Sequence, residues 1–222
     1  VAIVDAIVNR WKDKPIALVD DGTIHSRELV EAVRAALAEI GMTPVFSDTY
    51  RPAQEQQINL VRRLVKSGAT HVFTGGDRQD TAVIARDALG EGANLTLLGG
   101  DALNAADLTV PLADGVLAVT LPDAAQSPEG KPFADEMRAA GIEPEGYVMP
   151  AFAVMALLEE AKDRAAQDDK SLIEAIAGKG PYPTVLGLTA FNAAHERADN
   201  PYRLMQWQGG HFGPAAAEGA TP

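Results

Sequence analysis

The chain has 222 residues and a net charge of −12, and 46% of its residues are hydrophobic and 23% charged, which is ordinary for a soluble globular protein of one or two domains. The acidic balance disfavours nucleic acid and anionic membranes as partners. The chain has no cysteine, so disulfide frameworks, thiolate zinc sites and cysteine nucleophiles are excluded.

The first half of the chain alternates between two kinds of segment. Short apolar runs predict strands at 15–21, 43–50, 71–76, 95–101 and 115–122. Helical apolar spacing, in several cases closed by a glycine, predicts helices at 1–11, 26–41, 54–68 and 78–90. Because strands and helices alternate with short connections, we expect an α/β fold: a doubly wound parallel sheet with helices on both faces.

The second half of the chain is mainly helical and ends in strands. Helices are predicted at 131–141, 150–167 and 170–180, and strands at 184–191 and 202–214. The stretch Pro122–Gly130 has no periodicity and contains several turn residues, which indicates a crossing between domains. The predicted organisation is a lobe with a parallel sheet at 1–121, a helical segment at 122–190, and terminal strands with a tail at 191–222.

The N-terminal residues have no features of a targeting segment. No apolar run approaches the roughly 20 residues of a membrane helix, and no signal peptide is visible. The chain opens with "VAIVDAIVNRW", which has helical spacing from the first residue. We therefore expect the start to be a processed or truncated end.

Two copies of the tripeptide Gly-Gly-Asp, at 75–77 and 99–101, follow predicted strands. One helix separates these strands, so we expect them to be neighbours whose carboxyl ends share one edge of the sheet, where open parallel sheets bind ligands. Asp21 belongs to the same edge, and His25 follows it. Several carboxylates on one edge favour a cation, most simply an ammonium group. The candidate ligand-binding residues are Asp101, Asp77, His25, Asp21, Gly76 and Gly100.

A structural interpretation of these residues stays open beside the functional one. Aspartate before a helix is a preferred N-cap, and Gly-Gly-Asp is common in turns, so Asp77 and Asp101 could serve the fold alone. A single histidine without a partner is weak evidence for a site, and the four histidines show no metal-ligand spacing.

Motifs that would indicate catalysis or a cofactor are missing from the sequence. There is no nucleophile elbow, zinc-protease motif or phosphate-binding loop, and the two Gly-Gly-Asp segments lack the spacing that holds a dinucleotide. We therefore expect no cofactor, no metal and no enzymatic activity. A small α/β enzyme that uses the acidic edge remains an alternative, since carboxylate pairs can perform acid–base chemistry.

Several segments in order resemble the type I periplasmic solute-binding proteins of the leucine/isoleucine/valine-binding family, which serve ABC transporters. The resemblance spans residues 1 to 214, and the order and spacing of its segments are more specific than any one of them. The segments that carry it are "IALVDDGTIHSRELVEAVRAALAEIG", "INLVRRLVKSGATHVFTGG", "LTLLGGDAL", "LADGVLAVTLP", "AFAVMALLEEA" and "NPYRLMQWQGGHFGP".

The resemblance implies two lobes joined by crossing strands, which close on an amino acid or similar small amine or amide. It also implies a periplasmic location and a membrane permease as partner, with no role for nucleic acid. Family members carry an N-terminal lobe sequence before the point where this chain starts. We therefore expect 122–190 to belong to an incomplete first lobe, for which a second copy of the chain in a homodimer could supply the sheet.

For three candidate residues the resemblance implies a role. Asp101 falls where the family often places an acid on the ligand's α-ammonium group. Asp77 falls where the family often has an aromatic or polar ligand contact, and an acid there implies a ligand with a second positive or hydrogen-bond-donating group. His25 falls where many members have a tyrosine. A ligand-sensing domain of a receptor or transcription regulator with the same fold is a further alternative.

Overall fold

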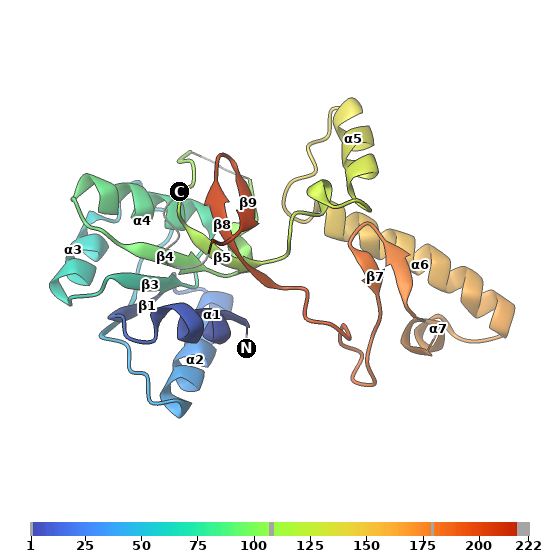
Figure 1. Cartoon of the computed structure of the whole chain (residues 1–222), viewed down its shortest axis with the longest axis horizontal. Coiled ribbons are helices and arrows are strands. Elements are labelled where there is room, and N and C mark those ends of the chain that lie inside the picture. Colours follow the sequence, from blue (N-terminus) through green and yellow to red (C-terminus); the bar gives the residue numbers. More distant parts are fainter. Residues whose placement is uncertain (1, 107–108, 179, 217–222) are drawn as a thin grey trace. The chain divides into compact units, whose positions relative to one another are not determined.

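A computed structural model of the chain describes residues 2–106, 109–178 and 180–216. The chain forms two compact units (Figure 1): residues 1–122 with 202–222 make up unit 1, and residues 123–201 make up unit 2. In the described part of the chain, no helix combines the length and apolar content needed to cross a membrane.

Unit 1 is built on a seven-stranded sheet with the strand order β2-β1-β3-β4-β5-β8-β9 (Figure 1). The first five strands of the chain run parallel, while the last two form an antiparallel hairpin that pairs with β5. This confirms the predicted α/β fold class and the terminal strand pair. The strands are β1 (Ile16–Asp20), β2 (Phe46–Thr49), β3 (His71–Thr74), β4 (Thr96–Gly99), β5 (Leu117–Thr120), β8 (Arg203–Gln208) and β9 (His211–Pro214).

Helices cover both faces of this sheet. Side chains of β1 alternate between the two faces, so Leu18 packs in one hydrophobic cluster with α1 and α2, and Val19 packs in the other with α3 and α4. All five residues of β1 are buried as a result, as expected for a central parallel strand. The helices are α1 (Ala2–Trp11), α2 (Ile24–Glu39), α3 (Ile58–Lys66), α4 (Arg78–Gly90) and the short 3₁₀ helix η1 (Asp101–Leu103).

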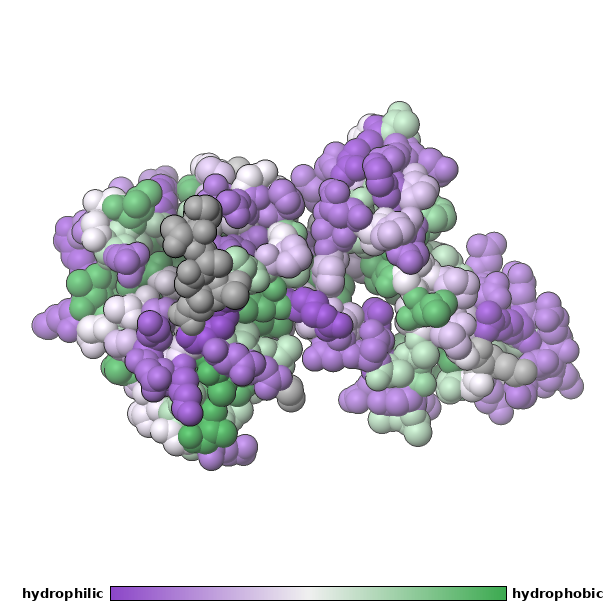
Figure 2. Space-filling model, in the orientation of Figure 1, coloured by the Kyte–Doolittle hydropathy of each residue, from purple (hydrophilic) through white to green (hydrophobic). Residues whose placement is uncertain are grey.

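Unit 2 consists of helices and one small hairpin. Three of the five buried residues of α6 are alanines, and the others are Met149 and Leu157. The Tyr182 hydroxyl donates a 2.7 Å hydrogen bond to the carbonyl of Ala175. The surface over the last turns of α6 is hydrophilic (Figure 2). The elements are η2 (Ala124–Gln126), α5 (Lys131–Ala139), α6 (Val148–Asp168), α7 (Leu172–Gly178), β6 (Tyr182–Thr184) and β7 (Gly187–Thr189).

The single strand predicted at 184–191 is wrong. The structure has two three-residue strands, β6 and β7, which pair antiparallel with Thr184 opposite Gly187. Gly187 has φ of 85°, a conformation that only glycine adopts readily, and it allows the reversal. The turn residue Val185 is buried among apolar side chains, which explains why an apolar run in the sequence conceals a turn.

Candidate functional site

The parallel strands of unit 1 end in register at one edge of the sheet. Val19 of β1 lies opposite Thr74 of β3, and Thr74 lies opposite Gly99 of β4. The prediction that the two strands before the Gly-Gly-Asp segments are neighbours is therefore confirmed. Their carboxyl ends bring Gly75 to Asp77 and Gly100 to Asp101 to one edge, together with the end of β1.

Asp77 caps a helix and keeps its carboxylate at the surface. It is the N-cap of α4, where its Oδ1 accepts a 2.8 Å hydrogen bond from the Asp80 N–H, and the residue is exposed. Its backbone carbonyl also accepts from the Thr81 hydroxyl at 2.7 Å. The capping interpretation of Asp77 is confirmed, but one carboxylate can cap a helix and still contact a ligand at the open side.

Asp101 has a different environment. It begins η1 and is half-buried, and its Oδ1 accepts a 2.7 Å hydrogen bond from the hydroxyl of Thr120 at the end of β5. Burial raises the pKa of Tyr202, and the nearby Asp101 carboxylate raises it further. Asp101 is thus a carboxylate positioned by the neighbouring strand, with a phenol close by, at the edge where parallel sheets bind ligands.

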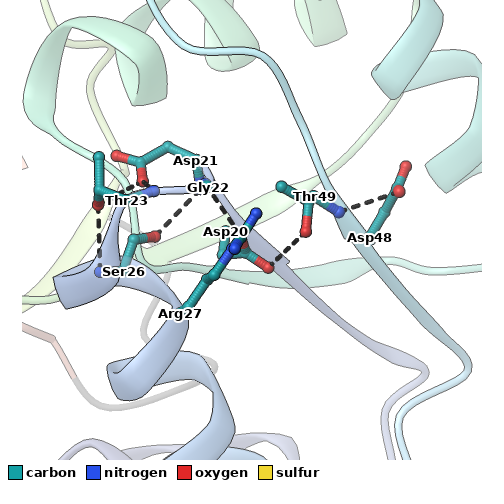
Figure 3. A network of polar contacts seen from close by, with 8 residues as sticks. All are labelled: Asp20, Asp21, Gly22, Thr23, Ser26, Arg27, Asp48 and Thr49. Atoms are coloured by element: carbon teal, nitrogen blue, oxygen red, sulfur yellow. Dashed lines mark hydrogen bonds and ion pairs between the residues drawn. The ribbon is translucent and has the colours of Figure 1, made fainter.

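Asp21 lies in the connection between β1 and α2 (Figure 3), and His25 lies in the first turn of α2. The Oδ1 of Asp21 accepts hydrogen bonds from the Thr23 N–H (2.9 Å) and hydroxyl (2.7 Å), while the Asp21 N–H donates to the Ser26 hydroxyl at 3.1 Å. Asp21 is buried and organises this loop. His25 is exposed on the first turn of α2.

Asp20, which we did not single out from the sequence, holds two strand ends together. Its Oδ2 accepts a 3.0 Å hydrogen bond from the Thr49 hydroxyl of β2, and its Oδ1 accepts from the Gly22 N–H at 2.9 Å (Figure 3). Arg27 lies 3.7 Å from the same carboxylate. Both acids thus have hydrogen-bond partners within the fold, and Asp21 is the one whose charge also raises the pKa values of Tyr50 and Asp80.

The two predicted glycines are buried and closely packed. A Cβ at Gly76 would lie 1.8 Å from the Tyr50 hydroxyl oxygen, and a Cβ at Gly100 would lie 3.3 Å from a methyl of Leu29. Next to Gly76, a Cβ at Gly75 would lie 2.8 Å from the backbone oxygen of Ser26. Packing inside unit 1 thus requires the glycines at 75 and 76.

Tyr50 and Asp80 join the candidate residues only in the tertiary structure. Both are buried, and among the described residues neither the Tyr50 hydroxyl nor Asp80 Oδ2 has a hydrogen-bond partner. Burial raises the pKa of Tyr50, and the carboxylates of Asp80, Asp21 and Asp77 raise it further. The nearby Thr74 hydroxyl acts in the opposite direction and lowers the pKa of Tyr50, but its geometry is too poor for a hydrogen bond to the Tyr50 hydroxyl.

The sequence holds weak signals for three residues that we did not single out from it: Tyr50, Asp80 and Thr120. Tyr50 is the aromatic residue that closes the predicted strand at 43–50, and Thr120 is a polar residue at the end of another. Asp80 lies three residues after the N-cap Asp77, a spacing that suggests reciprocal capping. Instead, Asp80 Oδ1 accepts a 2.8 Å hydrogen bond from the Ala53 N–H. Ala53 lies outside the helix, so the pattern of residues within the helix does not indicate this partner.

We expect the stability of unit 1 to depend on the protonation of Asp80. The pKa of Asp80 is raised to about 6, mainly by burial and to a smaller extent by the carboxylates of Asp77 and Asp21. The hydrogen bond from the Ala53 N–H acts in the opposite direction and lowers this pKa. The Tyr50 phenol lies close to the same carboxylate. Between the ordinary pKa of 3.8 and about 6, the folded protein holds a proton that the unfolded chain releases. The free energy of unfolding should therefore fall as the pH rises through this window.

The matched variant is Asp80→Asn, which keeps an oxygen for the Ala53 N–H and cannot titrate. Between about pH 4 and about pH 7, the free energy of unfolding of the wild type should fall relative to that of this variant by on the order of 1–2 kcal/mol, a value that allows for solvent screening at the sheet edge. Urea unfolding at several pH values measures the difference. A difference that stays constant across the range would show that Asp80 does not titrate there.

Within the described residues, no group of three or more histidine, aspartate or glutamate side chains could hold a metal ion. The acidic edge of unit 1 therefore offers carboxylates without the geometry of a metal centre. Its chemistry suits an organic cation, because an ammonium or guanidinium group donates several hydrogen bonds to carboxylates at once.

Comparison with known proteins places this edge in a family context. The sequence profile of the family described as periplasmic binding protein matches residues 1–211. The Leu/Ile/Val-binding protein homolog 2 of Brucella abortus is 26% identical over 211 residues, which cover 93% of this chain and 57% of that protein. The Leu/Ile/Val-binding protein BraC3 of Rhizobium johnstonii is 26% identical over 209 residues, with 92% and 57% covered. The chain thus spans 57% of the length of these relatives.

Two solved structures share the fold. The leucine binding protein LivK of Thermotoga maritima superposes with a TM-score of 0.76 at 16% identity, covering 97% of this chain and 63% of that one. An ABC transporter substrate-binding protein of Desulfitobacterium hafniense in complex with Leu superposes with a TM-score of 0.70 at 18% identity, covering 95% and 62%.

Proposed function

This chain belongs to the family of type I periplasmic binding proteins, and from that premise we propose that it binds an amino acid or a similar small amine as the substrate-binding component of an ABC transporter. The observation that supports this most directly is the carboxylate of Asp101, which is half-buried at the carboxyl end of β4 and oriented by Thr120. An anion in this position suits the α-ammonium group of an amino acid.

The names of the relatives support the class of ligand. Two curated relatives are named Leu/Ile/Val-binding proteins, and one solved structure of the same fold contains Leu. We propose the periplasm as the location, a membrane permease as the partner and binding without catalysis as the activity. A homodimer stays a prediction.

The test is a calorimetric titration of the full chain with a panel of amino acids. We expect at least one to bind and to raise the free energy of unfolding, by about 2.7 kcal/mol at a free concentration 100 times its dissociation constant. The matched control is the 2-hydroxy acid that corresponds to the best ligand, since it lacks only the α-ammonium group and should bind far more weakly. If no amino acid binds, or if the hydroxy acid binds equally well, the proposed function is wrong.

A sensing role remains the alternative. A solved structure of the same fold, from Rhodopseudomonas palustris, is described as an extracellular ligand-binding receptor, with a TM-score of 0.74 at 14% identity. The sequence that precedes these residues in the gene discriminates between the two roles. An export signal favours the transporter component, and a helix-turn-helix segment favours a transcription regulator.

A further inference from the structure

A second acidic location lies beside Asp101 on the same edge of the sheet, at the ends of β1, β2 and β3. Backbone hydrogen bonds join these ends: the Tyr50 N–H donates to the Asp20 carbonyl at 2.9 Å, and the Gly75 N–H donates to the Val19 carbonyl at 2.9 Å. The Tyr50 phenol packs over Gly76, which directly precedes Asp77. We call Asp21, Tyr50, Asp77 and Asp80 the acidic corner.

The acidic corner holds polar atoms whose hydrogen-bonding capacity is unused. Tyr50 is 4% exposed and Asp80 is 2% exposed, yet the Tyr50 hydroxyl and Asp80 Oδ2 have no hydrogen-bond partner in the described part of the chain. A buried polar group without a partner costs free energy. Here two such groups lie close to Asp77, whose carboxylate is exposed.

Two cationic side chains near the corner, those of Arg27 and Arg78, have partners outside it, while Arg51 follows Tyr50 in the chain and is exposed. Arg27 lies 3.7 Å from Asp20, outside the corner. Arg78 follows Asp77 in the sequence but donates to the Leu103 carbonyl at 2.9 Å and stacks on the Trp207 ring, 4.0 Å from its centroid. Over residues 2–106, 109–178 and 180–216, no ion pair involves Asp21, Asp77 or Asp80. Three carboxylates are therefore gathered without a protein cation between them.

The pKa values in the corner are consistent with three carboxylates that have no ion-pair partner among the described residues. Carboxylates brought together in a partly dry environment resist ionisation, and the pKa values of Tyr50 and Asp80 are both raised by burial and by the other acids of the corner. An added cation would stabilise the ionised form of the three carboxylates. An organic cation is favoured over a metal ion, because no described group of side chains has a metal-binding arrangement.

We propose that the acidic corner binds the cationic end of the ligand, so that the solute is an amino acid with an ammonium or guanidinium side chain. This inference rests on the proposed function, in which Asp101 binds the α-ammonium group. Asp77 and Asp80 follow β3, and Asp101 follows β4, which pairs directly with β3; neighbouring strands are about 4.8 Å apart. A ligand with its α-ammonium group at Asp101 would contact the corner through a cationic side chain such as that of lysine, ornithine or arginine.

The test compares lysine with norleucine, which has the same α-carbon groups and the same carbon chain without the terminal ammonium. In titrations of the full chain, lysine should bind at least about tenfold more tightly than norleucine. The Asp77→Asn variant should abolish most of this preference and leave norleucine nearly unchanged. Asparagine caps a helix as well as aspartate does, so this variant removes charge while it preserves the N-cap of α4.

The matched control variant is Asp163→Asn. Asp163 is exposed on α6 in unit 2, and its replacement changes the net charge by the same amount, so the lysine preference should persist. Equal or tighter binding of norleucine, or of leucine, by the wild type would overturn the inference and leave the proposed function intact. A lysine preference that Asp77→Asn does not reduce would also overturn it. If no amino acid binds, the proposed function itself fails and the inference with it.

Discussion

An Asp101→Asn variant is expected to bind its amino-acid ligand at least about 100-fold more weakly than the wild type, a loss of about 3 kcal/mol. The side-chain oxygen of asparagine can still accept the Thr120 hydroxyl, which donates to Asp101 at 2.7 Å, so the variant should fold. What it lacks is the negative charge opposite a desolvated ammonium group, and an ammonium group without its counter-charge is costly to bury. Calorimetric titration measures the change.

Two controls make the result for Asp101 specific. In Thr120→Val the carboxylate keeps its charge and loses only the hydroxyl that orients it, so the loss of affinity should be much smaller, about 1 kcal/mol. The 2-hydroxy acid analogue should lose little affinity in Asp101→Asn, because it has no ammonium group to pair. Unchanged affinity for the amino acid in Asp101→Asn would show that this carboxylate does not bind the ligand.

A Gly76→Ala variant is expected to destabilise unit 1 by about 2–3 kcal/mol through overpacking. The added Cβ would lie 1.8 Å from the Tyr50 hydroxyl oxygen and 3.1 Å from the ring carbon that bears it. The phenol is buried and packed in the hydrophobic cluster of β1, α3 and α4, so it cannot turn away without opening that cluster. Urea unfolding followed by tryptophan fluorescence reports on this unit, because both tryptophans, Trp11 and Trp207, belong to it.

A double-mutant cycle tests the cause of this destabilisation. In a Tyr50→Phe background the hydroxyl is gone and the nearest contact of the new methyl relaxes to about the 3.1 Å of the ring carbon. Gly76→Ala should then cost at least about 1 kcal/mol less than in the wild type. Gly90→Ala is the matched control, since a Cβ there meets nothing within 4 Å. Equal costs in the two backgrounds would show that Tyr50 does not require the glycine.

Local patterns in the sequence predicted most of the fold. The apolar runs of 15–21, 71–76 and 95–101 correspond to β1, β3 and β4, because a strand covered on both faces must be apolar throughout. The cap at Asp77 was also predictable, since capping depends on a few adjacent residues. The hairpin at β6 and β7 could not be predicted in this way, because its turn residue Val185 is apolar and packs in the hydrophobic core of unit 2.

The candidate site divides in the same way. The two Gly-Gly-Asp segments and Asp21 follow apolar runs, so their place at the carboxyl ends of strands was evident from residue order alone. Tyr50 and Asp80 were not predicted, because their significance lies in contacts made across strands: the phenol over Gly76, and the Asp80 carboxylate on the Ala53 N–H at 2.8 Å.

By itself, the sequence determined the strand and helix alternation, the parallel sheet and the acidic edge, since each follows from periodicity and from the rules that connect neighbouring elements. Only the tertiary structure decided which acids are committed to the fold, as Asp20 is to Thr49, and which retain unused hydrogen-bonding capacity, as Asp80 does. The physical reason is that burial and hydrogen-bond partners depend on residues far away in the chain, and no local pattern encodes them.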